Sequence, residues 1–251
     1  MRRTVVIGVD CATVDERIGL ARGEFSPLAR LNLLDAKRCA GDQGALQVLT
    51  NWISCSGPTV TIAVDAPLGW PVGLSAALAH HRAGLPVSVD AHSMFRRQTD
   101  ERVRALVGIT PLDVGADRIA RTAHAAVRLL GQLRNTLGLP IPLAWSPDAD
   151  GVNAIEVYPA ATLKAHGWRH KGYKKRTQLS ERREIVDALE KSGVNLNSFG
   201  PTLEASADAL DAVVCLIAAR DFIEGSAKPP EDGGLAAQEG WIWVHQSKPV
   251  G

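Results

Sequence analysis

The first third of the chain contains short apolar runs separated by polar breaks, and each run has the length of a strand. Val5–Val9 is apolar except for one glycine and ends at Asp10, and Thr59–Val64 is followed in the same way by Asp65. Runs of this kind are typical of central strands buried on both faces of a sheet. Two further strands are predicted between them, at Ile18–Arg22 and Leu28–Leu33.

Helical spacing of apolar residues dominates the remainder of the chain. A helix is predicted at Gly44–Ile53, and helical stretches without a convincing strand fill an insertion at about 70–150. The order of these elements predicts an α/β protein of one domain, residues 1–251, with a mixed five-stranded sheet flanked by helices and a helical insertion after the fourth strand. The elements expected after the insertion are a strand at Ala154–Tyr158, helices at Thr177–Lys191 and Leu203–Glu224, and a C-terminal hairpin at about 235–245.

Composition narrows the classes of protein that fit this pattern. The 251 residues are 45% hydrophobic and 22% charged, which are ordinary globular values, and the net charge is +1. A polybasic nucleic-acid binder is therefore excluded, and any such contact must come from a local patch. No apolar run approaches the roughly 20 residues that cross a bilayer, and the four cysteines form no C-x-x-C pair. We expect a soluble, reduced, cytoplasmic protein that has no membrane partner and carries no secretory signal.

Acidic residues interrupt the apolar elements at four positions. Asp10 and Asp65 each end an apolar strand, and both would emerge at the same sheet edge if these strands are parallel neighbours. Asp208 and Asp211 lie three residues apart on one face of an apolar helix. Alone, a strand-end aspartate is more often a turn or helix cap, and an aspartate pair near a helix start usually complements the helix dipole. Together, the acids form a set of oxygen ligands for two hard divalent cations, held by three separate elements.

Three other charged residues are candidates for the same site. Glu156 lies inside an apolar strand, where its side chain points either into the site or outward from a sheet edge. Arg96 and Arg97 lie in the helical insertion, and arginine forks suit phosphate oxygens. A surface salt bridge is the competing interpretation of both arginines.

A basic stretch at Lys164–Arg183 contains one acid, Glu181, and several interleaved aromatic residues. Cations follow the phosphates of nucleic acid, and aromatic rings stack on unpaired bases. We take Lys174, Lys175 and Arg176 as its substrate-binding candidates. A solvated loop followed by a helix start explains the stretch equally well.

Five motifs follow one another along the chain: Ile7-Gly8-Val9-Asp10, Val64-Asp65-Ala66-Pro67-Leu68-Gly69, Arg97-Gln98-Thr99-Asp100, Glu156-Val157-Tyr158-Pro159-Ala160 and Asp208-Ala209-Leu210-Asp211-Ala212. In this order they resemble the family called domain of unknown function 429, which is described as predicted ribonuclease H-like nucleases. The resemblance implies a ribonuclease H-like fold, and the acid layout is similar to that of Holliday-junction resolvases, whose acids match Asp10, Asp65, Asp208 and Asp211. Resolvases usually have Glu where Asp65 stands. Ribonuclease H proper has a Glu on the helix after strand three, where this chain offers only Asp42, so specificity for RNA–DNA hybrids is not indicated.

The first hypothesis is a metal-dependent nuclease that hydrolyses DNA or RNA. Two Mg²⁺ or Mn²⁺ ions would be held by Asp10, Asp65 and Asp211, with Asp208 or Glu156 completing the catalytic set. The first alternative is a phosphotransferase of the actin-like or sugar-kinase type, because Asp10-Cys11-Ala12-Thr13 is faintly similar to a phosphate loop. That class needs two copies of the fold. The second alternative is a non-catalytic nucleic-acid-binding module on a nuclease scaffold, and a homodimer is left open.

Overall fold

The computed structural model describes residues 4–26, 29–39, 44–115 and 117–246, which contain one five-stranded sheet in the order β3-β2-β1-β4-β5. The first three strands form an antiparallel meander, and β4 and β5 run parallel to β1. This order and polarity are those of the ribonuclease H-like fold, so the predicted fold class is confirmed. The strands are β1 (Thr4–Asp10), β2 (Gly19–Ser26), β3 (Ala29–Arg38), β4 (Val60–Asp65) and β5 (Val152–Glu156).

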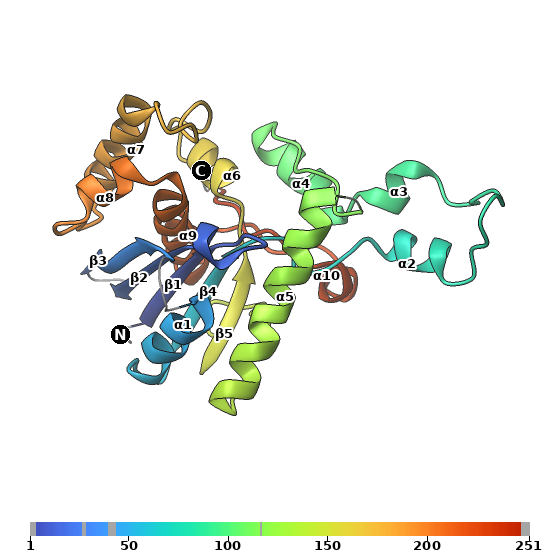
Figure 1. Ribbon diagram of the computed structural model, residues 1–251, viewed down its shortest axis with the longest axis horizontal. Coiled ribbons are helices and arrows are strands. Elements are labelled where there is room, and N and C mark those ends of the chain that lie inside the picture. The colour runs from blue at the N-terminus through green and yellow to red at the C-terminus, as the bar shows by residue number, and fades with distance from the viewer. Residues whose placement is uncertain (1–3, 27–28, 40–43, 116, 247–251) are drawn as a thin grey trace, which may run out of the picture.

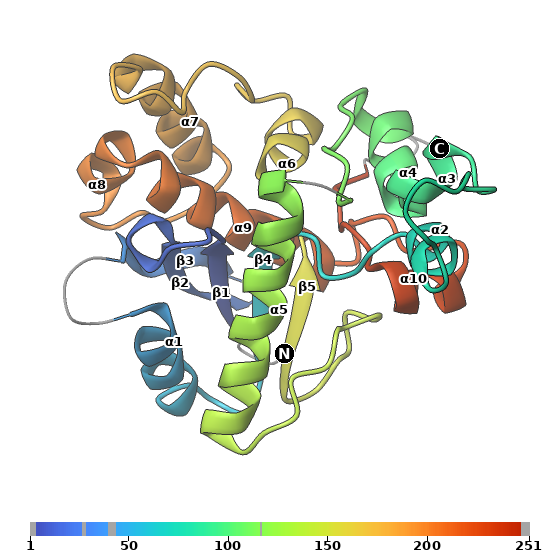
Figure 2. The same ribbon diagram turned by 45° about the vertical axis from the view of Figure 1, so that its right-hand side comes forward.

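Helices cover both faces of the sheet (Figures 1 and 2). One face carries α1 (Ala45–Ser54) and α5 (Asp117–Leu137), and the other carries α9 (Ala207–Ile223) with α7 (Leu179–Lys191) and α8 (Gly200–Ala205) beside it. The helical insertion between β4 and β5 begins with α2 and α3, which project away from the sheet in Figure 1. The remaining helices are η1 (Asp15–Arg17), α2 (Val72–Leu78), α3 (Ala91–Phe95), α4 (Gln98–Val107), α6 (Pro159–Ala165) and α10 (Gly233–Glu239).

The alternation of side chains along β1 divides the core in two. Val5, Ile7 and Val9 pack with α1 and α5, whereas Val6 packs with α9. Every second residue of a strand faces the same side, so Gly8 and Asp10 share the α9 side with Val6. Helix α9 is buried along most of its length and therefore shows apolar residues on all sides.

Gly8 allows α9 to approach the sheet closely. A Cβ atom at this position would lie 1.9 Å from the backbone oxygen of Ala212, a separation that real atoms never reach. Only glycine fits here without a shift of the helix. The close approach brings the helix turn that carries Asp211 next to the end of β1.

The predicted helix at Leu203–Glu224 is divided into α8 and α9 at Ser206. Ser206 is extended, and its hydroxyl accepts a hydrogen bond from the backbone N–H of Ala209 at 3.2 Å, which caps α9. Serine is a favoured N-cap because its side chain satisfies one of the free N–H groups of the first turn. The break therefore places Asp208 in the first turn of α9 rather than in the middle of a longer helix.

The predicted C-terminal hairpin at about 235–245 is wrong. Asp232 caps a short helix instead, because its carboxylate accepts from the Leu235 N–H at 3.0 Å, and Gly240 ends that helix at φ +83°. The following segment is extended and buried, and Ile242 forms a parallel bridge with Glu156 at the end of β5. The apolar residues that predicted a strand pair belong to this segment.

Other boundaries differ by a few residues at strand and helix ends. Strands β2 and β3 extend beyond the apolar runs that predicted them, because their later residues alternate between the core and solvent. No helix among the described residues is long and apolar enough to cross a membrane. Asp42 lies outside the described residues.

Candidate metal and nucleic-acid site

Asp10 and Asp65 occupy equivalent positions on neighbouring strands. They are paired in the parallel register of β1 and β4, whose backbones lie about 4.8 Å apart. Because residues in register face the same side, both carboxylates leave the sheet on the side covered by α9. Both side chains are partly buried.

Asp211 lies on α9, the helix that covers this side of the sheet, and its side chain is 2% exposed. The Tyr173 hydroxyl donates to Asp211 Oδ1 at 2.7 Å, and Lys174 Nζ lies 2.7 Å from Oδ2. We name Asp10, Asp65 and Asp211 the aspartate cluster. The three predicted metal ligands are therefore neighbours in space, and Lys174 is the counter-ion of Asp211.

Charge repulsion and burial act on this cluster together. Burial raises the pKa of Asp10 well above its ordinary value, and the charges of Asp211 and Asp65 raise it further. Burial also raises the pKa of Asp65 to about 7, although the charge of Lys174 opposes this rise. The pKa of Asp211 is raised by burial despite the same lysine. Among the described residues, the single positive charge of Lys174 therefore does not balance the three carboxylates.

The donor chemistry fits hard divalent cations, which prefer carboxylate oxygens and are bridged by shared aspartates. Among the described residues, one set of three ligand atoms lies within 4.8 Å of one another, and it is a different group, His166, Asp221 and His245. The aspartate cluster is therefore wider than the cage of one small ion. A cluster of this width suits ions that bridge pairs of carboxylates.

Asp208 lies at the rim of the cluster and is 37% exposed. Its charge contributes to the raised pKa values of Asp10 and Asp211. Its carboxylate also lies 3.3 Å from Arg38 Nε at the end of β3. Asp208 thus faces the cluster from outside while pairing with a surface arginine.

Arg182 was not identified from the sequence as part of the site. It is buried, and its guanidinium donates to the backbone oxygens of Tyr173 at 2.6 Å and of Lys175 at 2.9 Å. These bonds hold the loop that presents Tyr173 and Lys174 to Asp211. Within the basic stretch, only folding distinguishes this buried arginine from its exposed neighbours.

Lys175 and Arg176 are exposed, as a nucleic-acid contact requires. Arg176 lines an open depression beside Asp208, together with Arg38, Lys174 and Arg182. A second depression reaches Asp65 from the other side and is lined mainly by apolar and aromatic groups, including Pro111, Leu112 and Tyr158. The cluster lies between a basic surface and an apolar one.

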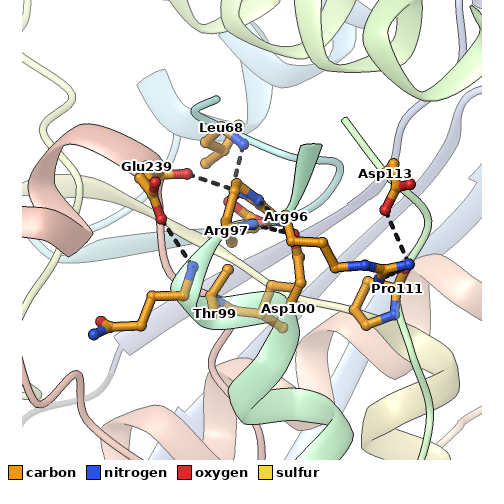
Figure 3. Close-up of polar contacts among 11 residues, drawn as sticks. Leu68, Arg96, Arg97, Thr99, Asp100, Pro111, Asp113 and Glu239 are labelled. Carbon is orange, nitrogen blue, oxygen red and sulfur yellow. Dashed lines mark hydrogen bonds and ion pairs between the residues drawn. The ribbon is translucent and has the colours of Figure 1, made fainter. Parts of the chain in front are cut away.

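The structure excludes Arg97 as a ligand for phosphate. Its side chain is 1% exposed, and all five of its N–H groups have acceptors. It pairs with Glu156 at 2.8 Å and with Asp100 at 2.9 Å, and a further N–H donates to the Glu239 backbone oxygen at 3.1 Å. Figure 3 shows Arg97 beside Asp100. We call Arg97, Asp100, Glu156 and Glu239 the arginine network. The prediction that Arg97 binds phosphate is wrong, because each of its guanidinium N–H groups already donates to an acceptor of the protein.

Glu156 belongs to this network and not to the aspartate cluster. It is paired in register with Val64, so it leaves the sheet on the face opposite to Asp65. One of its oxygens also accepts from the Leu68 N–H at 2.9 Å. Burial raises the pKa of Glu156, and Arg97 opposes that rise.

Arg96 points away from Arg97, toward Pro111 and Asp113 (Figure 3). Its guanidinium donates to the Pro111 backbone oxygen at 2.9 Å and lies 3.0 Å from an Asp113 oxygen, with 23% of the side chain exposed. This is the surface salt bridge considered as the competing interpretation. Arg96 supplies no free charge near the aspartates.

A family model described as "Protein of unknown function (DUF429)" matches residues 8–233. No curated protein matches the sequence. The chain is similar to "T. thermophilus RuvC in complex with Holliday junction substrate", with 14% identity and a TM-score of 0.38, over 90% of this chain and 99% of that one. A second structure, "Thermus thermophilus RuvC structure", has the same identity and coverage and a TM-score of 0.34.

Proposed function

The chain belongs to this family of unknown function, and we propose that it is a metal-dependent nuclease that hydrolyses phosphodiester bonds of nucleic acid at the aspartate cluster. One observation carries the proposal. Two strand ends and a buried helix bring Asp10, Asp65 and Asp211 to one side of the sheet, and among the described residues Lys174 is the cation paired with them. Buried charges in proteins are normally paired or bound to a metal ion.

Mg²⁺ or Mn²⁺ bound by the three aspartates would activate water and stabilise the leaving oxygen of a phosphodiester. Asp208, at the rim, completes the ligand set from the first turn of α9. Glu156 is left out of this set because it leaves the opposite face of the sheet.

Lys174 has two uses in this proposal. Without a cation, its ammonium neutralises Asp211 at 2.7 Å. Its side chain is 62% exposed, so the stem is free to swing outward. A lysine released from Asp211 would face the basic depression with Lys175 and Arg176, where the phosphates of DNA or RNA are expected.

The phosphotransferase alternative needs a second copy of the fold, and the described residues contain one sheet. The nuclease and the binding module remain to be separated by experiment. Purified full-length protein is incubated with labelled single-stranded, duplex and four-way-junction DNA and with RNA, with Mg²⁺, Mn²⁺ or EDTA.

Metal-dependent cleavage by the wild type, lowered at least about 100-fold in Asp10→Asn, supports a nuclease. Binding of the same oligonucleotides by both proteins without cleavage supports the module. Equal cleavage by both proteins refutes the assignment of Asp10.

A further inference from the structure

A second cluster of ligating side chains lies away from the aspartates. His166 follows the end of α6, Asp221 lies in the last turn of α9, and His245 belongs to the extended segment after α10. One ligand atom from each lies within 4.8 Å of the other two. Asp221 follows Asp211 by ten residues, about 15 Å of helix, so the two clusters are separate.

The carboxylate at the centre is buried. Asp221 is 3% exposed, and its Oδ2 lies 2.7 Å from His166 Nε2. Its Oδ1 lies 3.6 Å from His245 Nδ1, which is too long for a hydrogen bond. That Nδ1 atom is itself buried and has no hydrogen-bond partner among the described residues. A buried nitrogen that faces a buried carboxylate across such a gap is a polar group still in need of a partner.

The spacing suits a tetrahedral ion. Zinc binds nitrogen and carboxylate oxygen at about 2.0–2.2 Å, so neighbouring ligand atoms lie roughly 3.3–3.5 Å apart. His245 Nδ1 lies 3.6 Å from Asp221 Oδ1, which is already close to this value. His166 contacts the other carboxylate oxygen, Oδ2, at 2.7 Å, and this contact would have to lengthen by roughly 0.6–0.8 Å. The His166 ring stacks on Trp168 at 4.7 Å, which limits how the imidazole turns.

We propose that His166, Asp221 and His245 form a binding site for a borderline divalent transition metal, represented by Zn²⁺. Two imidazoles and one carboxylate select zinc, cobalt or nickel over the hard ions expected at the aspartate cluster. Three protein ligands leave one position for water. The guanidinium of Arg220, 3.6 Å from Asp221 Oδ1, weakens the site electrostatically.

An ion at this site would connect three segments of the chain: the end of α6, the last turn of α9 and the segment that contains His245. The terminal segment is held against the end of α9 by backbone hydrogen bonds from Lys228 to Val244 and from Gln246 to Ser226, at 2.9 and 2.8 Å. The metal would join this segment to α6 through side chains as well. Its role is therefore structural, and its effect appears in stability rather than in cleavage.

The test uses metal-stripped full-length protein titrated with Zn²⁺ in the presence of excess Mg²⁺. We expect one ion per chain and a raised melting temperature, with affinity at least about tenfold weaker in His245→Ala and His166→Ala. Asp10→Asn is the matched control and keeps full zinc affinity. Unchanged zinc affinity in both histidine variants, or no binding by the wild type, would mean that the three side chains form only an ion pair.

Cobalt separates this site from adventitious binding by cysteine. Co²⁺ bound to nitrogen and oxygen ligands gives d–d bands without the intense near-ultraviolet band of a cobalt–thiolate bond. A thiolate band that disappears in Cys55→Ser would assign the ion to that exposed thiol and overturn the proposal. If a histidine variant does not fold, the cobalt spectrum of the wild type decides between the two assignments. Loss of nuclease activity plays no part in either test.

Discussion

The arginine network and the aspartate cluster lie near the same end of the sheet, on opposite faces, and differ in how completely their charges are paired. In the network, the buried Arg97 has an acceptor for every N–H. Glu239 also accepts from the backbone N–H groups of Val72 and Gln98, which start α2 and α4. In the cluster, three carboxylates face each other with one ammonium beside Asp211.

The difference shows which buried charges are structural. Burial would favour neutral Arg97, yet Glu156 and Asp100 raise its pKa and keep it charged. No cation is paired with Asp10 among the described residues, and burial together with the charges of Asp211 and Asp65 pushes its carboxyl group toward the neutral form. A complete set of partners indicates a role in holding the fold, whereas an incomplete set is what we expect of the cation site that we propose.

Removing Arg97 should cause the largest change. Arg97→Met leaves Asp100 and Glu156 buried without their partner, and a buried pair broken in this way costs about 3–5 kcal/mol of unfolding free energy. Denaturant unfolding measures the loss. The matched control is Arg96→Met next to it, which removes a partly exposed pair and should cost about 1 kcal/mol or less. Equal losses in the two variants would contradict the contrast drawn here.

The next prediction concerns how the stability of the metal-free protein changes with pH. Because the pKa of Asp65 is raised to about 7 in the folded state, the folded chain binds a proton that the unfolded chain has lost above about pH 4. Stability contributed by this group therefore falls as pH rises from about 4 to about 7, and is constant above that.

Asp65→Asn removes this contribution, so its stability relative to wild type should increase over the same interval. Thermal melts at several pH values in EDTA measure it. Metal affinity has the opposite trend and should rise with pH through about 7, as protons stop competing. A pH-independent difference between the two proteins would show that Asp65 is already ionised at pH 4.

Asp10→Asn should change stability by about 1 kcal/mol or less without metal, and in the stabilising direction, because it removes repulsion while keeping shape. That corresponds to a rise of about 2–4 °C in melting temperature at most. The same variant should lose most of the shift that Mn²⁺ produces in the wild type. A destabilised variant that responds fully to Mn²⁺ would instead identify Asp10 as a structural cap.

The smallest effect concerns the exposed cations. Changing Lys175 and Arg176 together to Gln should reduce the salt dependence of nucleic-acid binding by about two units of slope or fewer, with little effect on folding. Binding titrations at several salt concentrations give the slope. The control is Arg169→Gln, whose guanidinium is already paired with Glu184 at 2.6 Å. Equal slopes in wild type and the double variant would make the patch a solvated surface.

The sequence predicted those parts of the fold and site that follow from local periodicity. Asp10 and Asp65 end apolar strands, and parallel neighbours end at the same edge of a sheet, so their proximity follows from the pattern. The three-residue spacing of Asp208 and Asp211 places them on one side of a helix. These positions need no knowledge of how loops close.

Other roles depend on contacts between distant segments. Arg96 and Arg97 are identical in type and adjacent, yet one is bound at the surface and the other is enclosed by β5 and the turn after α10. Tyr173 is one of the aromatic residues interleaved in the basic stretch, but its hydroxyl donates to Asp211, and Arg182 donates to its backbone oxygen. The C-terminal hairpin failed for a local reason, since the helix cap at Asp232 outweighed the apolar run.

The glycine at position 8 shows how the aspartate cluster depends on a residue without functional groups. A methyl group there would collide with the Ala212 backbone and force α9 outward, carrying Asp211 away from Asp10 and Asp65. The distance from Asp211 to Asp10 and Asp65 thus depends on how closely α9 packs against β1. A search restricted to charged side chains would overlook this position, although adding one methyl group there should separate the three carboxylates without changing any of them.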